Sequence, residues 1–238
     1  MILAAGASSR MGSPKALLDA GAGESFLDRL AGAFLASGCT VYAVLGEDAT
    51  LIAKANRRGA EITFVLNPDP SRGQLSSLQC GLRAAAGADA IFFTPVDAPG
   101  VACETIRLLL EFLTEKDFVI PIYEGQRGHP VLLRAGCAEA FLNPPEGASA
   151  RDILHARRTS TRFVEVADPG ILEDIDDPAA YERWRAGVLP RNFSTHSEPL
   201  PHGPGSGPEP CGDTEAAVGK RAHSGKQNAR SIPGGHPK

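Results

Sequence analysis

The alternation of two kinds of segment along residues 1–190 constrains the fold most strongly. Short runs rich in β-branched and aromatic residues predict strands, and stretches with helical spacing of apolar residues predict helices between them. The predicted strands lie at residues 1–5, 40–46, 61–66, 89–95, 117–123, 129–133 and 161–166. The predicted helices lie at residues 26–38, 48–58, 74–87, 101–115, 135–142 and 149–157, with a last one near 178–186. This alternation predicts a three-layer α/β/α fold around a mostly parallel, Rossmann-like sheet.

Two stretches depart from this pattern. The gap between 117–123 and 129–133 is too short for a crossover helix, which favours an antiparallel pair or an excursion from the main sheet. Residues 191–238 contain 7 Pro and 8 Gly with few large apolar side chains, so they cannot bury enough surface to offset the entropy of ordering. The sequence therefore predicts one domain over residues 1–190 and a disordered Pro/Gly-rich tail over 191–238.

Composition excludes several classes of protein. The apolar fraction of 42% is ample for a core, and the formal net charge of −4 gives no sign of a nucleic-acid-binding protein. The five cysteines are widely spaced and contain no C-x-x-C, which argues against a disulfide framework or a zinc site. We recognise no signal peptide, and no apolar run approaches the roughly 20 residues of a membrane helix. We therefore expect a soluble, cytoplasmic protein that does not bind membranes.

The segment GASSRMGSPK at residues 6–15 follows the first predicted strand, where an open α/β sheet usually binds phosphate. Gly6 and Gly12 permit a close approach to the backbone, whose exposed N–H groups can bind phosphate oxygens. Arg10 and Lys15 add positive charge. The dinucleotide fingerprint G-x-G-x-x-G and the P-loop are both absent. The segment is thus a phosphate-loop candidate of another type, and a polar connecting loop is the alternative.

The same segment carries a recognisable signature. Residues 3–18 read L-A-A-G-x-S-x-R-M-G-x-x-K-x-L-L, which resembles the signature of the MobA-like nucleotidyltransferases, and among them the molybdenum cofactor cytidylyltransferases. Further segments resemble the family in the same order, at residues 67–82, 94–101, 121–133 and 174–181. The resemblance covers roughly residues 2–186. It implies the nucleotide-diphospho-sugar transferase type of fold, with residues 1–190 as the nucleotidyltransferase domain.

A pair of carboxylates is the candidate metal site. Asp97 follows the predicted strand 89–95 and should stand beside the opening loop, where a nucleotide would be repelled unless a cation lay between them. Mg²⁺ fits such a place because it takes one or two protein carboxylates together with phosphate oxygens. The alternative is that Asp97 caps the helix after Pro99. The resemblance favours a metal ligand.

The second carboxylate comes from DIDDP at residues 174–178. Asp174 and Asp176 alternate along an extended stretch and point the same way, whereas Asp177 suits the cap of a helix that begins at Pro178. The resemblance assigns the metal to Asp176, with Asp174 in reserve. An acidic surface turn is the alternative.

The resemblance also implies the remaining site residues. Arg10, Lys15 and Asp97 would be catalytic. The nucleotide would contact Leu3, Ala4, Ala5, Gly6, Ser8, Ser9, Arg10, Gly12, Lys15, Asn67, Gly73 and Ser77, with Ser76 interchangeable with Ser77. Asn67, Gly73 and Ser77 surround a turn after a predicted strand, so the alternative is that they serve ordinary turn and capping roles. The acceptor side would contain Gly128, His129, Pro130 and Arg151, although a structural histidine and a surface arginine are common.

The reaction implied is transfer of a nucleoside monophosphate to a phosphorylated acceptor, with release of pyrophosphate and Mg²⁺ as cofactor. Ala5 stands where guanylyl-transferring relatives typically have glycine, and G-H-P is present at residues 128–130, which favours CTP and a pterin-type acceptor, the molybdenum cofactor. A transient molybdoenzyme or chaperone partner is a further expectation. The alternatives are a GTP-dependent or sugar- or polyol-phosphate transferase, a nucleotide-binding regulatory module, and a dehydrogenase. The last lacks its glycine fingerprint.

Overall fold

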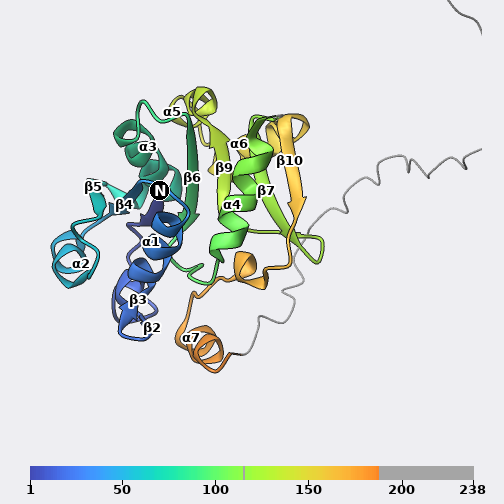
Figure 1. The fold of residues 1–238 in the computed structure, drawn as a ribbon. Helices are drawn as coiled ribbons and strands as arrows, with labels where there is room; N and C mark the ends of the chain where they lie inside the picture. Colours follow the sequence, from blue (N-terminus) through green and yellow to red (C-terminus); the bar gives the residue numbers. More distant parts are fainter. Residues whose placement is uncertain (115, 188–238) are drawn as a thin grey trace, which may run out of the picture. The chain divides into compact units, whose positions relative to one another are not determined.

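A mostly parallel sheet of eight strands forms the centre of the fold (Figure 1). The computed structural model describes residues 1–187 apart from residue 115. Along the sheet the strands follow the order β10-β7-β9-β6-β1-β4-β5, and β8 pairs with β7. Their bounds are β1 Ile2–Ala4, β4 Val41–Leu45, β5 Ile62–Leu66, β6 Ala90–Pro95, β7 Phe118–Tyr123, β8 Gln126–Arg127, β9 Val131–Arg134 and β10 Thr161–Glu165. The predicted α/β fold with a mostly parallel sheet is confirmed.

One strand runs against the others in the main path of the sheet. β9 lies between β7 and β6 and is antiparallel to both, which confirms the antiparallel pair predicted from the short gap. β1 pairs in parallel with β4 and β6, and β7 pairs in parallel with β10. Because β6 and β7 are each antiparallel to β9, the carboxyl ends of β1, β6 and β7 lie at one edge of the sheet. That edge is where an open α/β sheet binds its ligands.

Helices cover both faces of the sheet. Their bounds are α1 Phe26–Ala36, α2 Ala49–Ala55, α3 Gln74–Ala84, α4 Cys103–Glu111, α5 Glu139–Leu142, α6 Ala150–Ala156 and α7 Pro178–Arg185. Successive strand residues point to opposite faces, so neighbours such as Phe92 and Phe93 of β6 enter different cores. Side chains of α1 and α4 pack on one face, and those of α3, α5 and α6 pack on the other.

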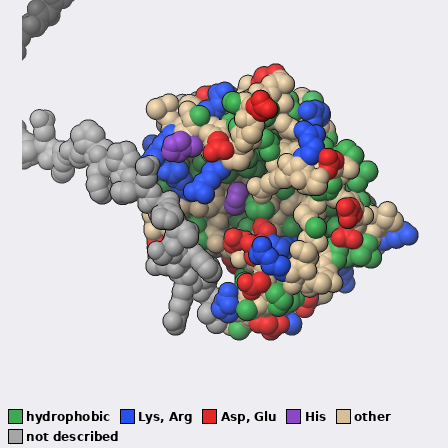
Figure 2. Space-filling view, turned by 180° about the vertical axis from the view of Figure 1, so that it is seen from behind, with side chains coloured by type: hydrophobic (Ala, Val, Ile, Leu, Met, Phe, Trp, Pro, Cys, Tyr) green, Lys and Arg blue, Asp and Glu red, His purple; other side chains and the backbone are tan. Residues whose placement is uncertain are grey.

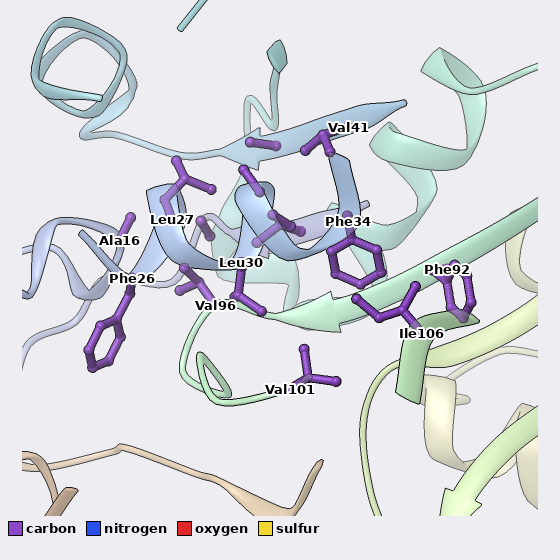
Figure 3. Close-up of a cluster of buried hydrophobic side chains, with 14 of the residues drawn as sticks. Ala16, Phe26, Leu27, Leu30, Phe34, Val41, Phe92, Val96, Val101 and Ile106 are labelled. Carbon is purple, nitrogen blue, oxygen red and sulfur yellow. The ribbon is translucent and has the colours of Figure 1, made fainter. Parts of the chain in front are cut away.

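The core beneath α1 is aromatic and aliphatic (Figure 3). Phe34 of α1 and Phe92 of β6 lie with ring centroids 5.6 Å apart, and Ile106 of α4 packs in the same cluster. All three side chains are buried, which stabilises each by about 1.5–3 kcal/mol relative to exposure. Ser25 fixes where α1 begins, because its side chain and that of Asp28 form a capping box.

The remaining differences from the predicted elements are local. A small hairpin, β2 Asp19–Gly21 and β3 Glu24–Ser25, lies between the opening loop and α1 and was not predicted. The predicted helix 135–142 divides into a 3₁₀ turn and α5. Residues 188–190 and the tail 191–238 lie outside the described residues. Among the described residues, no helix has both the length and the apolar character needed to span a membrane.

Gly46 lets β4 end against the base of the opening loop. A Cβ at this position would lie 2.6 Å from the carbonyl oxygen of Ala5 and 2.9 Å from Cγ of Pro70. We therefore expect Gly46→Ala to lower the free energy of unfolding by about 1–3 kcal/mol, the usual cost of overpacking. Urea denaturation measures this. Gly136→Ala is the matched control because no atom lies within 4 Å of its added Cβ, and equal losses in the two variants would contradict the prediction.

Candidate active site

Lys15 joins two distant carboxylates at the ligand-binding edge of the sheet. Its Nζ donates a hydrogen bond to Oδ2 of Asp97 at 2.9 Å and to Oδ1 of Asp176 at 2.5 Å. These partners lie 82 and 161 positions away in the sequence. The Lys15 side chain is only 13% exposed, and both contacts are ion pairs. The fold thus assembles one charged centre from three separate parts of the chain.

Strand pairing explains how Asp97 and the DIDDP segment meet. The N–H of Val96 donates to the carbonyl of Leu3 at 3.0 Å, which extends the β1–β6 pairing up to Asp97. The N–H of Ile175 then donates to the carbonyl of Asp97 at 3.1 Å. Ile175 is buried, whereas the residues on either side of it are exposed. This alternation turns Asp174 and Asp176 to the same side, as their spacing predicts.

Three carboxylates form a candidate metal centre, which we call the acidic cluster: Asp97, Asp174 and Asp176. One ligand oxygen from each lies within 4.8 Å of the others. Oxygen donors of this kind fit a hard divalent cation, so the residues present are suited to such an ion. Burial, followed by the charges of Asp176 and Asp97, raises the pKa of Asp174 above its ordinary value. Asp174 therefore joins the two carboxylates that the resemblance assigns to the metal.

The Lys15 ammonium neutralises part of this negative charge. Burial by itself lowers the pKa of Lys15, but the hydrogen bonds and charges of Asp176 and Asp97 outweigh that effect and raise it. Lys15 is therefore firmly protonated at neutral pH. Its ammonium group lies between the carboxylates of Asp97 and Asp176, which a bound metal ion would also contact.

The structure also identifies the residues that cap the nearby helices. Asp168, rather than Asp97, serves the start of α4, because its Oδ2 accepts hydrogen bonds from the N–H of Ala102 at 2.9 Å and the hydroxyl of Thr105 at 2.6 Å. Asp177 caps α7 and accepts from the N–H of Ala180 at 2.7 Å, as predicted. The capping alternative for Asp97 is therefore not what the structure shows.

Most backbone N–H groups of the opening loop have no hydrogen-bond acceptor among the described residues. In the part of the chain that the structure describes, the N–H groups of residues 6–10, 12 and 13 donate to no other residue. Ser8 and Gly12 adopt positive φ, at 44° and 67°, and the Ser8 hydroxyl accepts from the N–H of Lys15 at 3.0 Å. Arg10 is exposed. Leu3, Ala4 and Ala5 are buried below the loop, and Ser9 is exposed on it. This arrangement suits a polyphosphate.

The turn after β5 is held by hydrogen bonds between its own side chains, which was the stated alternative to nucleotide contacts. Asn67 is buried, and its Nδ2 donates to the hydroxyls of Ser76 at 2.9 Å and Ser77 at 3.0 Å. These bonds use both donor hydrogens of the amide to hold the turn against α3. Gly73, with φ of 87°, is exposed at the helix start. Direct contacts of Asn67 and Ser77 with a nucleotide stay a prediction, and their observed bonds are structural.

His129 lies on the route from β8 to β9, near the acidic cluster. Burial lowers the pKa of His129, while the charge of Asp97 and a hydrogen bond with the backbone of Phe93 act in the opposite direction. Its Nδ1 is buried and has no partner among the described residues. Gly128 has no room for a side chain, since a Cβ would lie 2.2 Å from the carbonyl oxygen of Ile171. Pro130 is buried, and Arg151 is exposed in the first turn of α6.

Glu173 stands next to the acidic cluster and was not predicted. Trp184 Nε1, from the single tryptophan of the chain, donates to its Oε1 at 2.8 Å. Burial raises the pKa of Glu173 to about 7, against the opposing hydrogen bond from Trp184. The folded state therefore binds a proton that the unfolded state releases near pH 4.5. The free energy of unfolding should accordingly fall as pH rises from about 4.5 to about 7 and then level off.

Glu173→Gln removes this titration but keeps an oxygen that can accept from Trp184. We expect the variant to match the wild type near pH 5 and to be more stable above pH 7 by roughly 2–3 kcal/mol. Urea unfolding followed by Trp184 fluorescence, in EDTA and at several pH values, measures the difference. A difference that stays constant across this pH range would contradict the prediction.

Comparisons with known proteins agree with this geometry. A family model described as "MobA-like NTP transferase domain" matches residues 1–161. Nicotine blue oxidoreductase of Paenarthrobacter nicotinovorans is 33% identical over 187 residues, covering 74% of this chain and 90% of that protein. Molybdenum cofactor cytidylyltransferase of Escherichia coli (strain K12) is 28% identical over 178 residues, covering 75% of this chain and 90% of that protein. The crystal structure of Rv0371c from Mycobacterium tuberculosis H37Rv in complex with manganese superposes with a TM-score of 0.59 at 22% identity, covering 79% and 95% of the two chains.

Proposed function

The chain belongs to the MobA-like NTP transferase family, and on that premise we propose that it transfers CMP from CTP to a phosphorylated acceptor, the molybdenum cofactor, and releases pyrophosphate. Residues 1–161 form a nucleotidyltransferase domain. The observation that carries the proposal is the Lys15 ammonium held between Asp97 and Asp176 beside a loop of free N–H donors. The similarity to a molybdenum cofactor cytidylyltransferase supports the choice of nucleotide and acceptor.

The chemistry follows from charge and position. A phosphate oxygen of the acceptor attacks the α-phosphorus of the triphosphate in line, the bond from that phosphorus to the bridging oxygen breaks, and pyrophosphate leaves. A phosphate monoester is already ionised, so no strong general base is needed. The loop N–H groups, Arg10 and Lys15 hold the triphosphate and offset the charge that develops on it.

The acidic cluster would hold a divalent cation, which the manganese complex of the structural relative supports. Asp97 and Asp176 would bind it, with Asp174 beside them. Such an ion supplies charge neutralisation at the phosphates when bound. We name Mg²⁺ as the ion because it combines carboxylate and phosphate oxygens in this way. His129 and its neighbours Gly128 and Pro130 would border the acceptor.

One relative favours a second candidate function. The protein that is 33% identical carries the name of an oxidoreductase, so a redox activity of this chain is the competing proposal. The residues of the acidic cluster and Lys15 fit phosphate chemistry better than hydride transfer, and no G-x-G-x-x-G occurs in the opening loop. Oxidation of NADH and NADPH in the presence of quinone and dye acceptors tests this alternative directly.

The test of the proposed function is release of pyrophosphate from each of the four NTPs with Mg²⁺ and purified molybdenum cofactor. We expect turnover with CTP and little with GTP. Turnover with GTP alone would overturn the base assignment, and turnover only with sugar or polyol phosphates would replace the acceptor. Tight nucleotide binding without any turnover would establish the regulatory alternative. Pull-down with a molybdoenzyme or its chaperone tests the proposed partners.

A further inference from the structure

Three arginines from separate elements gather on one face of the sheet. Arg127 ends β8 and lies opposite Ile122 of β7, while Phe163 of β10 lies opposite Ile120 of the same strand. Because Ile120 and Ile122 point to the same face, Arg127 and Phe163 share that face. The Arg127 guanidinium carbon lies 4.7 Å from the centroid of the Phe163 ring. This cation–π contact keeps the guanidinium beside the Phe163 ring.

The helix that covers this face and the 3₁₀ turn after it supply the other two arginines. Ile153 of α6 is buried in the same core as Ile120. Arg151 lies in the first turn of α6, and Arg158 begins the 3₁₀ turn Arg158–Ser160 that follows it. The charges of Arg158 and Arg151 act on Arg127 and, together with the larger effect of burial, lower its pKa. We call Arg127, Arg151 and Arg158 the arginine cluster.

Close ion pairs are missing from the arginine cluster among the described residues. In the described part of the chain, none of its members forms an ion pair with a carboxylate. Asp152, the neighbour of Arg151, instead bonds to Ser149 in the cap of α6. Arg158 is half-buried, and its Nη2 is fully shielded from solvent without a hydrogen-bond partner among the described residues. Leaving such a donor without an acceptor costs free energy, and an anion would supply the acceptor.

The arginine cluster is separate from the acidic cluster but joined to it through the chain. Arg127 is followed directly by Gly128 and His129, and the charge of Asp97 acts on His129. The charges of Arg158 and Arg151 act on Arg127. Figure 2 shows a group of Lys and Arg side chains with a histidine and an acidic side chain beside it, apart from a mixed acidic and basic group, and another histidine lies between the two groups. A substrate lying along His129 would therefore meet positive charge at its far end.

We propose that the arginine cluster binds a second anionic group of the acceptor, an oxyanion, at the end away from the phosphate that attacks. The identification of the bound molecule as the acceptor rests on the proposed transfer reaction, whereas the anion site itself does not. Guanidinium groups suit the purpose because they stay charged and present several N–H donors in one plane. A purely structural role would leave the Arg158 donor unexplained, since the contact with Phe163 involves only Arg127.

The probe is inorganic phosphate, titrated calorimetrically into the full chain at low ionic strength without nucleotide, with sodium chloride as the ionic-strength control. To remove binding at the opening loop, we use an Arg10→Gln/Lys15→Gln background. We expect Arg127→Gln, Arg151→Gln and Arg158→Gln each to weaken phosphate binding at least about 10-fold. Arg83→Gln, an exposed arginine in the last turn of α3, is the control of equal charge, with an effect of less than ~2-fold.

The outcomes separate the possibilities. If Arg83→Gln weakens phosphate binding as much as the cluster variants do, binding depends only on net charge and the proposed site is wrong. The proposed site is also wrong if the Arg10→Gln/Lys15→Gln background binds no phosphate, because all binding then occurs at the opening loop. If Arg158→Gln fails to fold, the phosphate affinities of the variants at the exposed residues Arg127 and Arg151 test the site. Because this assay uses no NTP, arginine-dependent binding without turnover would sustain the anion site and overturn the transferase proposal. Turnover together with phosphate binding that the arginine substitutions leave unchanged would sustain the transferase proposal and overturn the anion site.

With an active enzyme, Arg127→Gln should raise the KM for the acceptor and leave the KM for CTP unchanged.

Discussion

Asp97→Asn should lower kcat for nucleotidyl transfer at least about 10²-fold and leave the fold intact. Asparagine has the shape of aspartate but no charge, so Lys15 loses one of its two charged partners and the acidic cluster loses one of three carboxylates. Loss of a single preorganised electrostatic group at a reacting centre has an effect of this size. The rate of pyrophosphate release at saturating CTP measures it, with the thermal unfolding midpoint to verify folding.

Asp177→Asn is the matched control for that experiment. Asp177 lies next to Asp176 on the same segment, but its side chain caps α7, a role that asparagine also performs well. We expect kcat within about 2-fold of the wild type, since surface changes away from the reacting groups have small effects. Near wild-type activity of Asp97→Asn would contradict the proposed role and leave Asp97 as a structural partner of Lys15.

The strand and helix positions follow from side-chain patterns because burial dictates them. Residues 89–95 are almost continuously apolar, as expected of a strand buried on both faces, and the structure has β6 at Ala90–Pro95. The β2–β3 hairpin could not be predicted in this way. Its turn depends on positive φ at Gly21, Ala22 and Gly23, and only two of these are glycine, so backbone conformation rather than an apolar pattern forms it.

Parts of the candidate site were accessible to sequence reasoning for a topological reason. Lys15 and Asp97 each follow a predicted strand, and parallel strands bring their carboxyl ends to one edge. Asp176 depended on the resemblance, because its segment follows no predicted strand directly. Asn67 shows the limit of motif reasoning, since a polar residue in a turn can bind either a ligand or its own loop.

The residues that sequence reasoning missed carry no local signal. Arg127 and Arg158 lie far apart in the chain, and only the register of β8 and the packing of α6 bring their charges together. Glu173 is similar, because its raised pKa comes from burial beneath α7 and not from any neighbour in sequence. Burial and long-range pairing set these properties, so a single sequence could indicate the residues but not their electrostatic state.

Lys15→Met should have opposite effects on activity and on metal binding. Without the ammonium, kcat should fall on the order of 10²- to 10³-fold, because one group that offsets phosphate charge is lost. The metal-free protein should also lose roughly 1–3 kcal/mol of stability, since three carboxylates then face one another unpaired. Methionine keeps the length and apolar stem of lysine, so these losses report the charge.

Divalent ions should reverse the loss of stability in Lys15→Met, which makes this variant the strongest test of the acidic cluster. In the wild type, an arriving ion competes with Lys15 for Asp97 and Asp176. In Lys15→Met it does not, so Mn²⁺ or Mg²⁺ should raise the unfolding temperature more than in the wild type. Asp97→Asn should show the smallest rise of the three proteins, because a ligand is missing. If the ions stabilise Lys15→Met no more than the wild type, the lysine and the ion do not share these carboxylates, and the proposed metal centre is wrong.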